Sequence, residues 1–63
     1  MLNKAYYKHK YGLDLDDRRL EWRLFEENKL VINYLGNRFI LSHVELGKEN
    51  FNHLLQYLLY RNI

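Results

Sequence analysis

Two runs of alternating apolar residues meet at Gly36-Asn37, and this stretch constrains the fold of the 63-residue chain more than any other. Strict alternation is typical of a β-strand with two different faces, and a glycine and an asparagine between two such runs indicate a two-residue hairpin turn. A turn at Gly36-Asn37 predicts these cross-strand pairs on one face: Tyr34 with Phe39, Ile32 with Leu41, and Leu30 with His43.

Upstream, residues 20–34 predict a second hairpin. A three-residue loop at Glu26-Glu27-Asn28, with Asn28 in the left-handed conformation, would join its strands. With this loop length, three cross-strand pairs of large side chains lie on one face of the sheet: Leu24 with Leu30, Trp22 with Ile32, and Leu20 with Tyr34. The alternative is a helix over residues 16–29, because "DDRRLEWRLFEENK" has an acidic start and many good helix formers.

The apolar period changes to that of a helix after Gly47. Phe51, Leu54, Leu55, Leu58 and Leu59 follow helical spacing, which predicts an amphipathic helix over residues 48–61.

A second, shorter helix is expected at the N-terminus, where Gly12 would end it. Its apolar stripe would contain Leu2, Ala5, Tyr6 and His9.

Together these elements predict a single small α+β domain over residues 1–63. It has a short N-terminal helix, a three-stranded antiparallel meander and a C-terminal amphipathic helix packed on one sheet face. Residues 1–12 could also be a loosely packed arm. In the order of its elements the chain is similar to double-stranded-RNA-binding domains. It departs from that family where Lys48 is followed at once by Glu49, instead of a lysine-rich start to the last helix, so the similarity is one of topology.

Composition limits the function classes. The chain has no cysteine, and lysines interrupt every window of the N-terminus where a signal peptide needs its apolar run. No segment approaches the roughly 20 apolar residues of a membrane span. We therefore expect a soluble, cytoplasmic protein that does not bind membranes.

No motif for metal binding stands in the sequence. The acidic run Asp14–Asp17 resembles the start of a calcium loop, but Arg19 and Phe25 occupy the positions that need glycine and glutamate. Helix capping or solvation accounts better for these acids. The three histidines, at positions 9, 43 and 53, share no ligand spacing.

No motif for catalysis stands in the sequence either. Ser42 is the only serine, and its neighbour His43 would point to the opposite face of a strand. We expect no enzymatic activity and no cofactor.

The second face of the predicted sheet is unusual because half of its residues are apolar. It contains Glu21, Arg23, Phe25, Val31, Asn33, Leu35, Arg38, Ile40, Ser42 and Val44. The C-terminal helix adds an aromatic ridge of His53, Tyr57 and Tyr60 at i, i+4 and i+7. Aromatic residues and arginines dominate binding energy at interfaces. The predicted partner-binding residues are His53, Tyr57, Tyr60, Arg23, Phe25, Arg38 and Ile40.

These leftover surfaces predict a small non-enzymatic interaction module. It would regulate or inhibit a larger protein by covering a site on it, as small proteins of phages and other mobile elements do, and it could form a homodimer. Alternatively, Tyr6 or Tyr7 packs against the helix ridge, and the ridge is then the edge of the core.

Nucleic-acid binding is the competing function. "KAYYKHKY" mixes lysines with tyrosines, which suits contact with phosphates and stacking on bases, while the sheet arginines suit base edges. The residues predicted for this function are Lys4, Tyr7, Lys8, Lys10 and Arg38. A net charge of only +2 is low for a dedicated binder.

Overall fold

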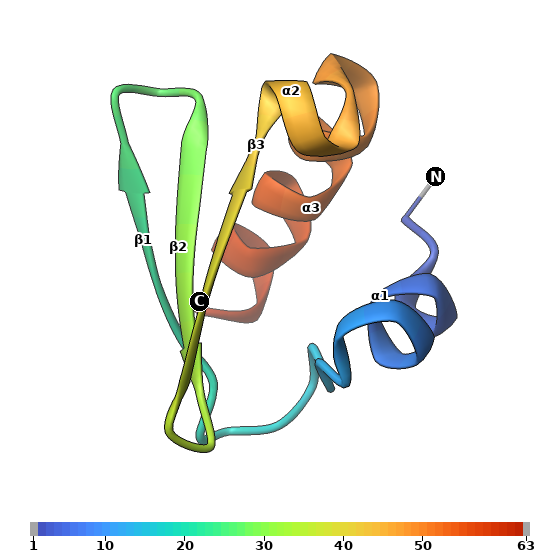
Figure 1. The fold of residues 1–63 in the computed structure, drawn as a ribbon, viewed down its shortest axis with the longest axis vertical. Helices are drawn as coiled ribbons and strands as arrows, with labels where there is room; N and C mark the ends of the chain where they lie inside the picture. Colours follow the sequence, from blue (N-terminus) through green and yellow to red (C-terminus); the bar gives the residue numbers. More distant parts are fainter. Residues whose placement is uncertain (1, 63) are drawn as a thin grey trace.

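The computed structural model describes residues 2–62 as a sheet of three strands with helices on one side (Figure 1). Helix α1 spans Lys4–Tyr11 and is followed by a loop that enters the sheet. The strands are β1 (Glu21–Phe25), β2 (Lys29–Tyr34) and β3 (Asn37–Ser42), all antiparallel in the order β1-β2-β3. A single turn of helix, α2 (His43–Leu46), leads into α3 (Lys48–Arg61). The predicted α+β fold is confirmed, and residues 21–25 form a strand, not a helix.

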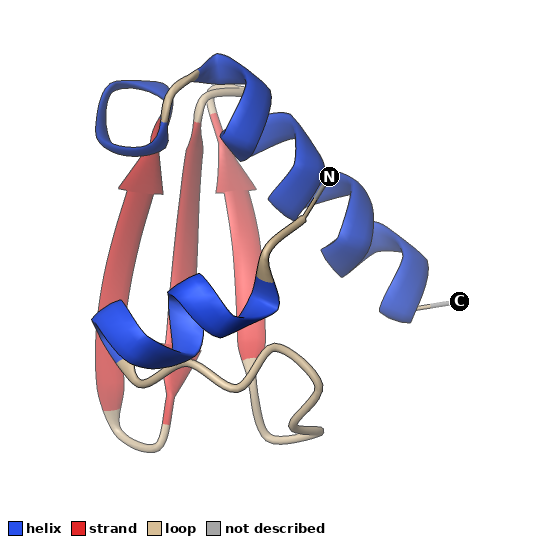
Figure 2. Ribbon diagram, turned by 90° about the vertical axis from the view of Figure 1, so that its right-hand side faces the viewer, coloured by secondary structure: helices blue, strands red, loops and turns tan. Residues whose placement is uncertain are grey.

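Both long helices lie on the same side of the sheet. Figure 2 shows α1 and α3 in front of the three strands, and Figure 1 shows the other side of the sheet without any covering segment. The N-terminal helix therefore does not cover the second face of the sheet.

The hairpin of β1 and β2 has the predicted register. Trp22 lies opposite Ile32 and Leu24 lies opposite Leu30. The turn differs from the prediction, because Glu26 and Glu27 take the left-handed conformation, with φ of 54° and 63°, and Asn28 does not. The backbone N–H of Asn28 instead donates to the carbonyl of Phe25 and closes the turn.

The hairpin of β2 and β3 turns one residue earlier than predicted. Its turn residues are Leu35 and Gly36, with φ of 50° and 84°, as a type I′ turn requires. Tyr34 consequently lies opposite Asn37 and Ile32 opposite Phe39, so the predicted pairs in this hairpin are wrong. Moving a two-residue turn by one position slides the pairing by two residues, so the residues that stay in β2 and β3 keep their predicted faces. Leu35, predicted on the second face, is instead a turn residue.

The core lies between the sheet and the two long helices. The strands bury Leu30, Ile32, Tyr34 and Leu41, and the helices bury Tyr7, Leu46, Phe51, Leu54 and Leu58. The loop before β1 contributes three more buried leucines, Leu13, Leu15 and Leu20.

Two predicted helix faces need correction. In α1 the buried residue is Tyr7, with Leu2 and Tyr11 packed at the edge of the core, whereas Ala5, Tyr6 and His9 are exposed. In α3 the predicted stripe is buried at Phe51, Leu54 and Leu58, but Leu59 is exposed and Tyr57 packs against the core in its place.

The strand β3 ends earlier than expected. Ser42 caps α2, since its Oγ accepts a hydrogen bond from the backbone N–H of Glu45 at 3.2 Å. His43 therefore leaves the sheet, and its ring packs edge-on against Phe51 with centroids 4.3 Å apart. Val44, predicted on the second sheet face, lies on α2 and is exposed.

Candidate functional site

The second face of the sheet, here called the open face, is built by three cross-strand rows. The middle row is Arg23, Val31 and Ile40, and the rows beside it are Glu21–Asn33–Arg38 and Phe25–Lys29–Ser42. Because adjacent strand residues alternate between faces, the register alone places these side chains together. Four of the predicted partner-binding residues, Arg23, Phe25, Arg38 and Ile40, thus share one surface.

This open face is shallowly hollowed. A depression of about 400 Å³ is lined by Arg23, Phe25, Val31, Asn33, Arg38 and Ile40. Ile40 is 60% exposed and Phe25 is 46% exposed, although both are large apolar side chains on regular strands. Val31 and Asn33 complete the lining. They were not among the predicted partner-binding residues, but the cross-strand register places them beside those residues.

The open face carries an excess of positive charge. Arg23 and Arg38 form no ion pair with any residue of 2–62, and Lys29 has only a 3.6 Å pair with the neighbouring Glu26. Glu21 is the one acid in the three rows. An apolar centre with free guanidinium groups at its sides can take up a partner surface that presents carboxylates around apolar side chains.

The aromatic ridge of α3 lies on the other side of the molecule, with the helix layer. His53 and Tyr57 are half-buried, and Tyr60 is 71% exposed. The Tyr57 and Tyr60 rings lie at a centroid distance of 6.4 Å. The seven predicted partner-binding residues therefore form two separate surfaces, and the sheet surface is the one that the structure assembles into a single hollow.

Tyr57 takes part in an internal network instead of standing free. Its hydroxyl donates a hydrogen bond to the carboxylate of Asp16, and the Lys4 ammonium lies 2.9 Å from the same carboxylate and 5.2 Å from the Tyr57 ring centroid. The Tyr57 hydroxyl, followed by Lys4, holds the pKa of Asp16 below its usual range. The bond to Asp16 also raises the pKa of Tyr57. These three side chains tie α1, the loop and α3 together.

The neighbouring Asp17 is the centre of a second network. Its carboxylate accepts from the Arg19 guanidinium at 2.8 Å and from the Tyr34 hydroxyl at 2.7 Å, while its backbone carbonyl accepts from Arg61 at 2.7 Å. The hydrogen bonds from Arg19, followed by the one from Tyr34, hold the pKa of the Asp17 carboxyl well below its ordinary value. The acids expected to be solvated or to cap a helix are therefore the fastening points of residues 13–20.

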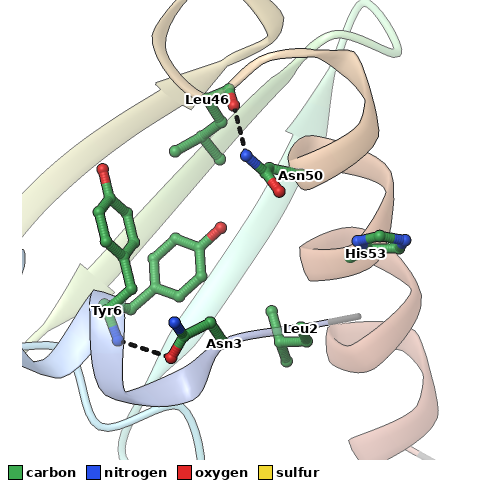
Figure 3. Close-up of a pocket in the computed structure, with 7 residues that line it drawn as sticks. Leu2, Asn3, Tyr6, Leu46, Asn50 and His53 are labelled. Atoms are coloured by element: carbon green, nitrogen blue, oxygen red, sulfur yellow. Dashed lines mark hydrogen bonds between the residues drawn. The ribbon is translucent and has the colours of Figure 1, made fainter.

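A small cavity lies between α1 and α3 (Figure 3). It has a volume of about 270 Å³ and is lined by Leu2, Asn3, Tyr6, Tyr7, Leu46, Asn50 and His53. Asn3 accepts from the backbone N–H of Tyr6, and Asn50 donates to the carbonyl of Leu46, both at 3.1 Å. These bonds fix the two amides as structural groups. The volume is below the roughly 300–1,000 Å³ of sites that enclose drug-sized ligands.

The residues predicted for nucleic-acid binding are not brought together. Tyr7 is only 3% exposed, so its ring has no free face for a base. Lys4 is paired with Asp16, and Lys10 donates to the Tyr6 hydroxyl at 3.1 Å. Lys8 is exposed on α1, on the opposite side of the sheet from Arg38.

The part of the chain that the structure describes holds no group of three metal-ligating side chains. Nor does any helix within residues 2–62 have the length and apolar character needed to cross a membrane. Comparison with known proteins finds no family model, no curated protein and no solved structure that matches this chain.

Proposed function

We propose that this chain is a small protein-interaction module that binds a larger protein through its open face and regulates or inhibits it by covering a site. The observation that supports this proposal is the uncovered apolar row of Val31 and Ile40 beside Phe25, flanked by the unpaired Arg23 and Arg38. Sheets with one solvated face usually carry polar residues there. Exposed apolar area rimmed by polar groups is typical of an interaction surface.

The positive charge of the open face indicates which charge the partner's surface should carry. Because its unpaired groups are arginines, the complementary surface should present acidic side chains around an apolar centre. Arginine can pair with a carboxylate through two parallel hydrogen bonds, which fixes orientation as well as adding affinity. The partner is therefore a protein with an acidic rim around apolar residues.

The test compares two double variants of equal charge. In Arg23→Ala/Arg38→Ala the open face loses both guanidinium groups, and in Lys8→Ala/Arg18→Ala two exposed cations are removed elsewhere. Proteins that the wild-type chain and the control variant retain from nuclease-treated host lysate, and that the open-face variant loses, are the partner candidates. Each candidate is then purified and its affinity is measured by calorimetry.

We expect the open-face variant to bind the purified partner at least about 30-fold more weakly, since truncating an interface anchor costs about 2 kcal/mol or more. The control variant should bind within a few-fold of wild type. A partner that binds both variants equally well would contradict the proposal. Proteins that are retained only from lysate without nuclease treatment would instead favour nucleic acid, and anisotropy titrations of labelled DNA and RNA would then replace calorimetry.

A further inference from the structure

The two outer strands of the sheet each have an edge whose backbone groups lack a partner. In the β2–β3 hairpin the two-residue turn makes Tyr34 and Asn37 the first hydrogen-bonded pair, so Phe39 and Leu41 also direct their N–H and C=O groups to β2. The N–H and C=O groups of Arg38 and Ile40 consequently point away from the sheet. Nor does any of them take part in a turn, loop or cap backbone hydrogen bond within residues 2–62.

The same reasoning gives the outward groups of the other edge. The β2 groups that do not face β3 belong to Lys29, Val31 and Asn33, which pair with Phe25, Arg23 and Glu21. The N–H and C=O groups of Trp22 and Leu24 therefore point outward from β1.

The two edges differ in how well they are protected against pairing. Three glutamates, Glu21, Glu26 and Glu27, lie in or directly beside β1, and charged residues on an edge oppose strand addition. Figure 2 also shows the C-terminal end of α3 passing beyond β1. Strand β3 carries one charged residue, Arg38, and no proline, and its pairing with β2 runs through all six residues without a bulge. Its edge is therefore the less protected one.

We propose that a second copy of this chain pairs antiparallel along β3, with the two-fold axis at Phe39. In this register Arg38 lies opposite Ile40 of the second copy, and the reverse pair follows from symmetry. Both residues present outward N–H and C=O groups, so each of these pairs can exchange two hydrogen bonds. The side chains directly opposed are Phe39 against Phe39 and arginine against isoleucine, with no like charges facing.

The same strand addition is less favourable at β1. A two-fold axis at Arg23 would pair Trp22 with Leu24 of the second copy, but it would set two arginines directly against each other. The two glutamates that follow the strand, Glu26 and Glu27, also disfavour strand addition at this edge.

Dimerisation at β3 has a consequence for the open face. It would join two sheets into one of six strands, with both open faces on the same side, because strand addition preserves the alternation of side chains. A single strand edge buries much less than the roughly 800 Å² per partner of a standard interface, so the self-association should be weak, in the micromolar range. The dimer does not require a partner on the open face, so the two proposals can fail separately.

The first experiment is sedimentation velocity on the chain alone from micromolar to millimolar concentration. Wild type should shift from monomer to dimer across this range. The variant Ile40→Pro removes one outward N–H from the β3 edge, so it loses a hydrogen bond between the copies and should stay monomeric. It should still fold, because proline is tolerated at an edge position whose N–H faces solvent. The matched variant Leu24→Pro removes an outward N–H from the β1 edge and should dimerise like wild type.

Amide hydrogen exchange on the wild-type chain provides a second measurement that does not depend on the variants folding. At millimolar concentration the N–H groups of Arg38 and Ile40 should be protected, and this protection should disappear on dilution. The N–H groups of Trp22 and Leu24 should exchange rapidly at both concentrations. A chain that stays monomeric at millimolar concentration, or protection that develops at Trp22 and Leu24, would overturn the proposal.

Discussion

Ile32 and Ile40 lie on opposite faces of one sheet, and only the first is covered. Ile32 is fully buried beneath the helices, whereas Ile40 is 60% exposed on the open face. Both faces carry large apolar side chains in the same alternating pattern, so the pattern alone does not show which of them becomes the core. The difference arises because α1 and α3 both pack on one side and leave no segment of residues 2–62 for the other.

Charged groups differ between two regions in the same way. In the loop at residues 13–20, the Asp16 carboxylate is held by Lys4 and Tyr57, and the Asp17 carboxylate is held by Tyr34 and the nearby Arg19. On the open face, Arg23 and Arg38 have no ion-pair partner among the described residues. Charges that are engaged inside the molecule contribute to its stability, and charges that are left over on an apolar surface are available to another molecule.

The comparison of the two faces predicts the largest effect for a pair of identical substitutions. Ile32→Ala should lower the free energy of unfolding by about 2–5 kcal/mol, because it leaves a cavity in the core. Ile40→Ala should lower it by less than about 0.5 kcal/mol, as expected for an exposed site. Urea denaturation followed by circular dichroism measures both. A large loss of stability for Ile40→Ala would show that the open face is covered in solution, so the two faces would not differ as the structure indicates.

The sequence predicts those features of the fold that are set by residues close together in the chain. The register of β1 with β2 was predictable because Leu20, Trp22 and Leu24 alternate with one period and fit one loop length. The helix α3 was predictable for the same reason, since its apolar spacing is helical from Phe51 onward, although either Gly47 or Asn50 could have capped its start. The open face followed from period-two alternation, which a slip of two residues does not disturb.

What the sequence did not reveal depends on contacts between distant residues. Leu13 and Leu15 look like loop residues because acids surround them, yet both are buried since Asp16 and Asp17 fasten the loop to Tyr57 and Tyr34. The same contact, across 41 positions, draws Tyr57 out of the ridge that helical spacing predicts. No local pattern encodes such a pair.

The two loop acids make the fold sensitive to acid, which is the second prediction. The pKa values of Asp16 and Asp17 are lowered in the folded chain, from an ordinary value of 3.8. A lowered folded-state pKa stabilises the fold above the unfolded-state pKa, and this stability is lost as the pH falls below about 3.8 toward the folded-state value. The urea midpoint should therefore be constant from pH 7 to pH 5 and decline steeply below pH 4.

Two variants connect this acid sensitivity to the loop. Asp17→Asn weakens the contacts with Arg19 and Tyr34, so it should lower the midpoint at pH 7 and flatten the decline below pH 4. Glu21→Gln, on the open face, removes no contact that the described residues make and should leave the acid profile unchanged. An acid profile that is the same in wild type and Asp17→Asn would show that these acids do not carry the dependence.

The smallest predicted effect is a gain of stability at the tip of the β2–β3 hairpin. Leu35 holds a φ of 50° and its side chain is 57% exposed. The left-handed conformation costs an L-residue about 1–2 kcal/mol, and asparagine followed by glycine is the preferred pair for this turn. Leu35→Asn, which retains Gly36, should therefore raise the free energy of unfolding by about 1 kcal/mol. Leu35→Ala should change the free energy of unfolding little, because alanine bears the same conformational cost. A loss of stability in Leu35→Asn would mean that the leucine side chain makes a contact the fold needs.

If the gain is observed, the exposed leucine is retained against the stability of the free chain. Leu35→Asn should then also weaken partner binding, as strained residues that are kept at a surface tend to serve function there.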